Sequence, residues 1–234
     1  YWDFWNEQIN RCVNGYTTGG IFIPGPYYYG LNFYTLQGLS NKSLMYPIIN
    51  DLDLESFQIL DHVKQNNLPG VIFPKARRKG LTEIACIMDL HGMSFIPAFR
   101  GAVVTGHNSY IEVYQNKLFN AMNNVNPHMH INKLRKNPIL ETGVEARKSK
   151  ERFKKFGFGG SVRFETMSDN PNKLEGEYFN IAHIEEAGNF PNVGEVFTSM
   201  EPAMKWGALY KGFFMIYGTG DNILSTSKGF KELW

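Results

Sequence analysis

The sequence is short of cysteine, of net charge and of long apolar runs. Its 234 residues include two cysteines, Cys12 and Cys86, at no spacing typical of a metal motif or a disulfide framework, which suits a reducing intracellular compartment. The formal net charge is +2, so any affinity for nucleic acid must come from local clusters of charge. No apolar run approaches the ~18 residues of a spanning helix and no signal-peptide pattern opens the chain, so we expect a soluble protein without membrane contact.

What the chain does have is enough apolar residues for one substantial core, with 43% hydrophobic and 15% aromatic residues. It also has one local cluster of positive charge. Between Lys133 and Lys155 there are nine Lys or Arg residues against three Glu. Two interpretations of this cluster stay open, a solvated loop and a surface that contacts a phosphate backbone.

The residue composition changes near residue 50. Residues 1–50 are aromatic and rich in Gly and Pro, and we expect short strands or an extended lead-in there, without a long helix. From residue 51 onward, strands alternate with helices, which predicts an α/β fold with a largely parallel sheet and functional loops at the carboxyl edge. The expected helices are 51–67, 82–93, 109–125 and 193–205, and the expected strands are 69–75, 101–106, 161–167, 178–186 and 212–220.

The first strand-to-helix turn is KARRKGLTE, residues 75–83. A phosphate-binding loop needs converging backbone N–H groups, a cation and a hydroxyl for magnesium. Gly80 permits the turn and Thr82 supplies the hydroxyl, but Leu81 stands where such loops usually carry lysine. By itself the stretch is a weak signal for a phosphate loop, and a basic strand-to-helix turn is the commoner meaning of such a pattern.

Two later strands also end in polar residues. YFNIAHIEEAG finishes with Glu185 and Glu186, which a turn at the strand end can aim at one site, one carboxylate toward a metal and one toward an attacking water. In GFFMIYGTGD, glycines flank Thr219 and permit close approach of the backbone. The order and spacing of the three strand ends, more than any one of them, indicate a nucleotide site.

Taken together, these segments resemble the N-terminal ATPase domain of a tailed-phage terminase large subunit. PYYYGLNF resembles the aromatic stretch before the ATPase core of that family, and ESFQILDHV places Gln58 where the family has an adenine-contacting glutamine. Lys75 resembles the lysine of a deviant Walker A loop, in which the cation comes first. The resemblance implies a P-loop NTPase of the ASCE/RecA-like class, a three-layer α/β sandwich around a largely parallel sheet.

The same resemblance implies roles for individual residues. Gln58 would contact adenine, Lys75 and Glu186 would be catalytic, and Thr219 would couple hydrolysis to movement. Thr82 and Glu185, the Walker B acid, would hold Mg²⁺. The remaining nucleotide contacts would come from Arg77, Arg78, Lys79, Gly80 and Leu81. A trans-acting arginine finger from a neighbouring subunit would be one of Arg100, Arg147, Arg152 and Arg163.

For the whole chain, the resemblance implies an ATPase that uses ATP and Mg²⁺ and drives double-stranded viral DNA into a procapsid in the cytoplasm of an infected bacterial host. Expected partners are DNA, the portal protein, the small terminase subunit and further copies in a homo-oligomeric ring, a pentamer by resemblance. Residues 1–50 would be the lead-in packed on the core and 51–234 the ATPase domain, with a basic insertion at about 131–157. A nuclease domain would follow Trp234, so no DNA cleavage is expected.

Two alternatives stay open at this stage. One is a helicase-like or repair P-loop ATPase, which keeps the fold and changes the task. The other is a non-hydrolysing DNA-binding or scaffold module with a degenerate loop.

Overall fold

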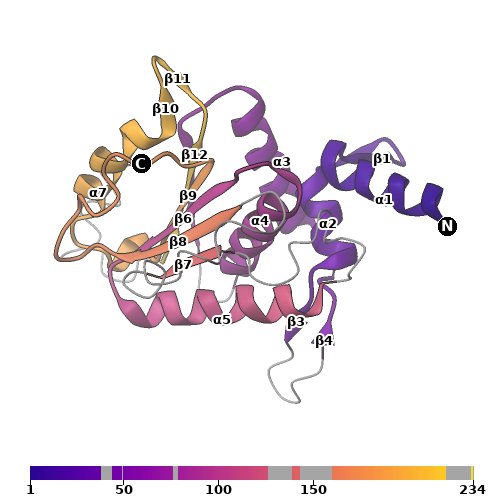
Figure 1. Cartoon of the computed structure of the whole chain (residues 1–234), viewed down its shortest axis with the longest axis horizontal. Helices are drawn as coiled ribbons and strands as arrows, with labels where there is room; N and C mark the ends of the chain where they lie inside the picture. The colour runs from indigo at the N-terminus through magenta and orange to yellow at the C-terminus, as the bar shows by residue number, and fades with distance from the viewer. Residues whose placement is uncertain are drawn as a thin grey trace.

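The computed structural model of the chain is a parallel sheet between two layers of helices (Figure 1). It describes residues 1–37, 44–48, 50–75, 79–125, 139–142, 160–219 and 233. Within this part, the central sheet has the strand order β5-β12-β9-β6-β8-β7, and all neighbouring strands are parallel. Its strands are β5 (Gly70–Pro74), β6 (Arg100–Thr105), β7 (Ile139–Thr142), β8 (Ser161–Thr166), β9 (Ile181–Glu185) and β12 (Phe213–Gly218).

The order of the strands differs from their order in the chain. β12 lies between β5 and β9, although it is the last of the three in sequence. The sheet is parallel throughout its described strands and has helices on both faces, as a three-layer α/β sandwich requires. The expected fold class is therefore confirmed.

Helices cover both faces of the sheet because its strands bury both sets of alternating side chains. Val103 packs into the core shared with the first helical layer, whereas Ala102 and Val104 pack into the core on the opposite face. The first layer contains α3 (Asp51–Gln65), α4 (Leu81–Phe95) and α5 (Asn108–Asn124), and the second contains α7 (Val193–Met200) with the 3-10 turns η4 (Ala187–Asn189) and η5 (Glu201–Met204).

The amino-terminal region corrects one expectation. It contains two helices, α1 (Trp2–Asn14) and α2 (Gly25–Phe33). Pro26 falls in the first turn of α2, where its missing N–H removes no helical hydrogen bond. The aromatic run Tyr27–Tyr29 is buried in the same core as α4. Gly25 and Pro26 therefore mark the start of a helix, whereas Gly19 and Gly20 turn between two short strands of the kind expected. Two short ribbons accompany these helices, β1 (Tyr16–Thr18) with β2 (Ile21–Ile23) and β3 (Leu36–Gln37) with β4 (Leu44–Met45).

Later in the chain, most expected elements are present within two or three residues of their expected ends. Strand β7 and the hairpin of β10 (Lys205–Trp206) and β11 (Leu209–Tyr210) were not expected. Strands of two to four residues are too short to show a period. Most of the basic cluster and the insertion at about 131–157 lie outside the described residues. None of the described helices has the length and apolarity needed to cross a membrane.

Candidate active site

The carboxyl ends of three adjacent strands bring the candidate residues together. In the sheet register, Pro74 of β5 lies opposite Gly218 of β12, and Tyr217 of β12 lies opposite Glu185 of β9. Lys75 follows β5 directly, and its backbone N–H donates to the carbonyl of Gly218 at 3.0 Å. Because parallel strands end at the same edge, the loop, the acidic pair and the glycine-flanked threonine converge there.

The first acid is held between two hydroxyl groups. The Oγ1 of Thr82 donates to Oε1 of Glu185 at 2.7 Å, and the hydroxyl of Tyr217 donates to Oε2 at 3.1 Å. Glu185 is only 4% exposed. A buried carboxylate at the end of β9 and a threonine hydroxyl at the start of α4 thus lie side by side.

Burial raises the pKa of Glu185 above its ordinary value of 4.5, and the hydrogen bond from Thr82 and the charge of Lys75 oppose that rise. Burial also raises the pKa of Tyr217 well above 10, with Glu185 adding to the shift, so the tyrosine stays a donor. A carboxylate must lose its proton to bind a cation. Cation binding at Glu185 should therefore weaken as the pH falls toward its raised pKa.

The second acid is paired with the first residue of the loop. The Nζ of Lys75 lies 2.8 Å from Oε1 of Glu186, and these side chains are 9% and 16% exposed. The same ammonium lies 5.4 Å from the centre of the Tyr217 ring. The lysine is therefore enclosed at the site and faces a carboxylate, where the sequence had left open whether it faced phosphate or water.

A strained turn aims Glu186 at this lysine. Glu186 adopts the left-handed conformation (φ 51°, ψ 45°), which is uncommon for a residue with a Cβ. The backbone N–H and the hydroxyl of Thr219 both lie 3.4 Å from its Oε2. A Cβ at Gly218 would lie 2.6 Å from the backbone nitrogen of Ala187, so only glycine fits beside the turn. The chain turns immediately after the strand, and the two acids reach different partners.

The start of α4 is open to a ligand. Gly80 is the residue before the helix, with φ 78° and ψ 0°, and it offers no side-chain cap. A Cβ added there would meet nothing within 4 Å. The first N–H groups of a helix have no intrahelical acceptor, and the helix dipole favours an anion there. Lys79 is exposed beside this end, whereas Arg77 and Arg78 lie outside the described residues.

Two residues expected to contact nucleotide have other surroundings. The side chain of Leu81 is 5% exposed and belongs to the core, so only its backbone is available to a phosphate. The Nε2 of Gln58 donates to the carbonyl of Phe22 at 2.9 Å, on the ribbon formed by β1 and β2. Neither placement tests the role proposed for the residue.

A cavity of about 270 Å³ lies beside Gly80, on α2, α3, α4 and β4. Its walls include the aromatic side chains of Tyr27, Tyr46 and Phe57, and Asp53 supplies a polar group. Gln58 is not among its lining residues. The cavity therefore offers an aromatic surface next to the loop, and Gln58 is not part of it.

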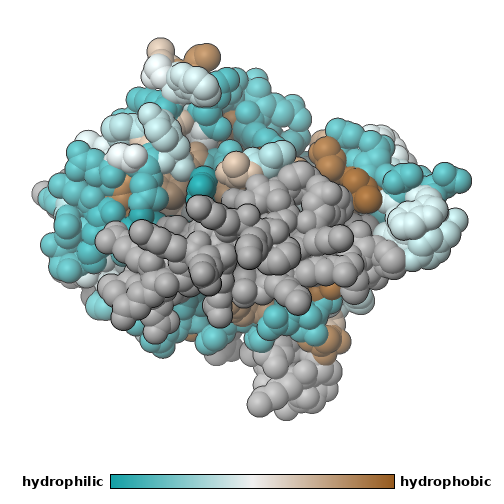
Figure 2. Space-filling view, viewed as in Figure 1, coloured by the Kyte–Doolittle hydropathy of each residue, from teal (hydrophilic) through white to brown (hydrophobic). Residues whose placement is uncertain are grey.

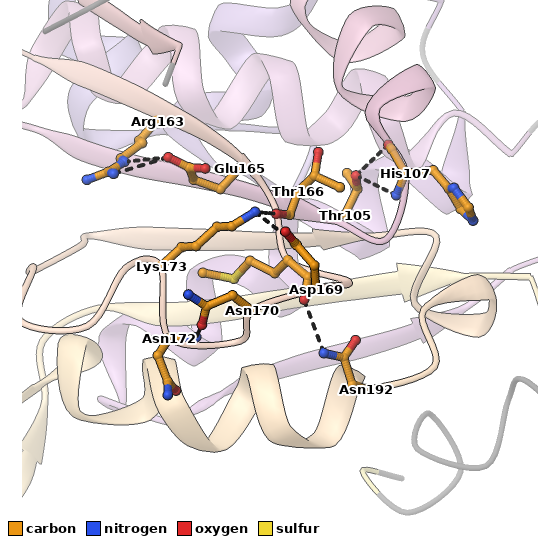
Figure 3. Close-up of polar contacts among 11 residues, drawn as sticks. Thr105, His107, Arg163, Glu165, Thr166, Asp169, Asn170, Asn172, Lys173 and Asn192 are labelled. Carbon is orange, nitrogen blue, oxygen red and sulfur yellow. Dashed lines mark hydrogen bonds and ion pairs between the residues drawn. The ribbon is translucent and has the colours of Figure 1, made fainter. Parts of the chain in front are cut away.

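Polar side chains near the ends of β6 and β8 bond mainly to groups in their own neighbourhood (Figure 3). The hydroxyl of Thr105 donates to the carbonyl of His107 at 2.7 Å, and Lys173 donates to the carbonyl of Thr166. Arg163 pairs with two carboxylates of its own chain, Glu165 at 3.1 Å and Glu177. The guanidinium of Arg163 is therefore engaged within the subunit.

The other candidate fingers are placed differently. Arg100 begins β6 at the amino edge of the sheet, opposite the edge that carries Lys75 and Glu186. Arg147 and Arg152 lie outside the described residues. Of the two candidate arginines in the described part of the chain, neither Arg100 nor Arg163 is bonded to Lys75, Glu185 or Glu186.

Tyr217 is the residue that the sequence analysis missed. Its ring lies beside Lys75 and its hydroxyl bonds Glu185, so it contacts both halves of the site. A hydroxyl-bearing residue two positions before Thr219, at the end of an otherwise apolar strand, was the available signal. Its significance depends on β12 lying between β5 and β9, which the sequence does not show.

The oxygen ligands suit Mg²⁺, which is commonly held by one or two carboxylates together with water and substrate phosphates. Here the carboxylate of Glu185 ends β9, and the hydroxyl of Thr82 in the first turn of α4 lies 2.7 Å from it. Among the described residues there is no group of three His, Cys, Asp or Glu side chains that would hold a metal alone. The site therefore fits a cation that arrives with a phosphate ligand.

Comparisons with known proteins address the fold. No protein-family model and no curated protein sequence matches the chain. The crystal structure of the HK97 bacteriophage large terminase matches with a TM-score of 0.51 and 12% identity, over 81% of this chain and 36% of that one. A mutant of the Thermus phage P74-26 large terminase ATPase domain matches with a TM-score of 0.47 and 13% identity, over 74% of this chain and 65% of that one.

The chain thus spans about a third of the length of the HK97 terminase. At this level of identity the likeness concerns the fold alone. The resemblance to phage large terminases that the sequence suggested is confirmed at that level: the chain has the P-loop fold of the HK97 large terminase over the region matched.

Proposed function

We propose that the chain is the ATP-hydrolysing motor domain of a phage terminase large subunit. One observation carries the proposal: the loop lysine, the helix-start threonine, the acidic pair and the glycine-flanked threonine converge at one sheet edge. A basic surface turn would not require a buried lysine. Here the side chain of Lys75 is largely enclosed and faces Glu186. This placement is expected if the lysine moves to the phosphates when a nucleotide binds.

In the proposed site, Lys75 exchanges partners when ATP binds. Its ammonium leaves Glu186 for the phosphate oxygens, which carry more negative charge than a single carboxylate. Glu186 is then free to accept a hydrogen bond from the attacking water and to orient it. Thr219 contacts the same carboxylate. A movement of Glu186 would therefore change the contacts of the residue that follows β12.

Thr82 and Glu185 would hold Mg²⁺, which supplies charge neutralisation to the phosphates when bound. Tyr217 keeps Glu185 in place from the neighbouring strand, since its hydroxyl stays protonated. Backbone N–H groups at the start of α4, beyond Gly80, bind phosphate. Lys79, Arg77 and Arg78 remain proposed contacts.

The adenine base has two candidate positions. Gln58 remains the residue implied by resemblance, although its amide is bonded to the ribbon of β1 and β2. The cavity beside Gly80 is the other, because its aromatic walls can stack on a base. Replacing Tyr46 or Gln58 with alanine separates the two, since only the residue that contacts the base should weaken ATP binding when changed.

The proposed task is translocation of double-stranded viral DNA into a procapsid. It would require the portal protein, a small terminase subunit and further copies of this chain in a ring. An arginine finger supplied in trans can be worth ~10³-fold or more in rate. Slow turnover by an isolated subunit is therefore expected and does not count against the proposal.

ATP binding tests the proposal most directly. Labelled ATP and Mg²⁺ are mixed with the parent chain, with Lys75→Ala and with Glu186→Gln. We expect binding by the parent, loss of binding in the lysine variant, and binding without turnover in the glutamate variant. Matched controls are Lys64→Ala and Glu195→Gln, which remove a lysine and a glutamate from helices away from the site and should bind ATP as the parent does.

The outcomes also separate the alternatives. An absence of ATP binding by the parent would leave a non-hydrolysing module and refute the motor. Hydrolysis coupled to strand separation would favour a helicase-like or repair ATPase. Cleavage of DNA by the purified chain with Mg²⁺ or Mn²⁺ would contradict the expectation that nuclease activity lies elsewhere.

A further inference from the structure

A second open groove lies at the opposite edge of the sheet from the ATP site. It has a volume of about 550 Å³ and is formed at the amino ends of β6 and β9, beside the hairpin of β10 and β11. In Figure 1 this hairpin projects from the body of the molecule, and Figure 2 shows a mainly hydrophilic surface with an apolar tip there. Nothing in the proposed ATPase chemistry uses this groove.

Two aromatic side chains of the groove are almost fully exposed. Tyr178 is 72% exposed and Trp206 is 79% exposed. Large rings normally bury most of their area, because each buried ring contributes substantially to the hydrophobic free energy. Two exposed rings beside one groove therefore indicate a surface that stacks on a ligand.

The charge around these rings has one sign. Arg100, Lys205 and Lys211 line the groove, and no carboxylate does. Lys205 is paired with Glu201 at 2.7 Å, whereas Arg100 and Lys211 make no ion pair among the described residues. The Nη1 of Arg100 donates to the hydroxyl of Ser161 at 2.9 Å, which orients the guanidinium and leaves its other donors available.

The hairpin that carries Trp206 is braced from below. Tyr210 donates to Glu201, and the ammonium of Lys205 lies 4.7 Å from the centre of the Tyr210 ring. The N–H groups of Lys211 and Gly212 both donate to the carbonyl of Met204, at 2.8 and 3.0 Å. Trp206 is therefore presented on a fixed support, which lowers the entropy cost of stacking.

We propose that this groove binds a single strand of nucleic acid. Tyr178 and Trp206 stack on bases, and Arg100 and Lys211 contact phosphates, the combination that sequence-independent single-strand sites use. In a duplex the base faces are already stacked on one another, so the rings would have no partner. Arg100 and Lys211 without a carboxylate among the groove's lining residues favour a polyanion as the ligand. The inference goes beyond the proposed motor function, because it requires neither ATP nor duplex translocation.

Fluorescence of Trp206 gives a local test. Changing Trp2, Trp5 and Trp234 to phenylalanine leaves Trp206 as the sole tryptophan of the full chain. We expect its emission to be quenched by a 15-nucleotide oligothymidylate and not by a duplex of the same length. An unchanged emission, at an oligonucleotide concentration that saturates binding of a labelled strand, would place the strand elsewhere and overturn the proposal. Equal quenching by duplex would overturn the single-strand preference.

Affinities of variants give the second test, by anisotropy of the labelled strand. Trp206→Leu should bind about five- to 150-fold more weakly, the range for loss of one stacking partner. Trp2→Leu is the matched control, since Trp2 is 71% exposed and lies on α1. This variant should bind the strand as the parent does. Unchanged affinity in Trp206→Leu would refute the stacking role.

Salt dependence gives the third. Each phosphate contact on a single strand contributes about 0.7 to the slope of log K against log salt. Changing Arg100 and Lys211 together to alanine should lower the slope by about 1.4, and Lys64→Ala should not change it. An unchanged slope in the double variant would overturn the phosphate contacts. ATP binding measured on Trp206→Leu and on Lys211→Ala alone should equal that of the parent, so failure of the groove and failure of the ATP site are distinguishable.

Discussion

A buried carboxylate beneath the proposed ATP site offers a prediction with a defined magnitude. Asp89 lies in α4, seven residues after Thr82, and is 0% exposed. Its Oδ2 accepts from the hydroxyl of Tyr114 at 2.6 Å, and its Oδ1 lies 3.1 Å from Nε2 of His183. Since His183 precedes Glu185 by two residues on β9, this cluster joins the helix after the phosphate loop to the acidic strand.

The perturbation is Asp89→Leu, which keeps the volume roughly constant and removes both acceptors. The hydroxyl of Tyr114 and the Nε2 of His183 would then be buried without their partner. Each buried polar group left unsatisfied costs about 1–3 kcal/mol, and two groups lose their acceptor here. We therefore expect the free energy of unfolding to fall by about 2–6 kcal/mol.

Urea unfolding with linear extrapolation measures this loss. Met88→Leu is the matched control, because it exchanges similar volumes at the adjacent position and should cost less than about 1.5 kcal/mol. Asp89→Leu combined with Tyr114→Phe and His183→Phe should recover part of the loss, since an apolar replacement of the whole cluster leaves no orphaned donor. A loss below about 1 kcal/mol in the single variant would refute the view that this carboxylate is structurally required.

Three further predictions concern pH, packing and the metal site. Burial lowers the pKa of His91 to about 4, so between pH 6.5 and 4 the unfolded chain binds a proton that the folded chain does not. As the pH falls through that window, the free energy of unfolding should fall by up to about 3 kcal/mol. Urea unfolding at pH 7 and 4.5 should show that His91→Gln lacks this part of the loss. An identical pH dependence in both chains would contradict it. Gly218→Ala places a Cβ 2.6 Å from the Ala187 nitrogen, and the free energy of unfolding measured in urea should fall by about 1–3 kcal/mol. An unchanged free energy of unfolding would contradict this. Tyr217→Phe removes a hydrogen bond to Glu185, and the Mg²⁺ concentration for half-maximal ATP binding should rise several-fold, whereas an unchanged midpoint would remove the tyrosine from the site.

Much of the fold was predictable because apolar residues recur about every 2 residues in strands and about every 3.6 residues in helices, and this period is visible within one segment. Helix α3 has Phe57, Leu60 and Val63 on its buried face, and the acidic strand β9 is an apolar run that ends in two glutamates. The edge on which the functional residues gather also follows from the sequence, because parallel strands place their carboxyl ends together. Helices α1 and α2 were not predicted, since aromatic, Gly and Pro residues carry turn signals that packing against α4 overrides.

The sequence by itself determined which residues stand at the ends of strands: Lys75, Glu185, Glu186 and Thr219. Only the tertiary structure decided which side chains meet. Strand order places β12 between β5 and β9, so that Tyr217 contacts Glu185 and Lys75 is enclosed against Glu186. The physical reason is that a pattern along the chain records the face that each residue presents, whereas partners depend on which strands are neighbours. That order is set by packing of the whole sheet between its two helical layers.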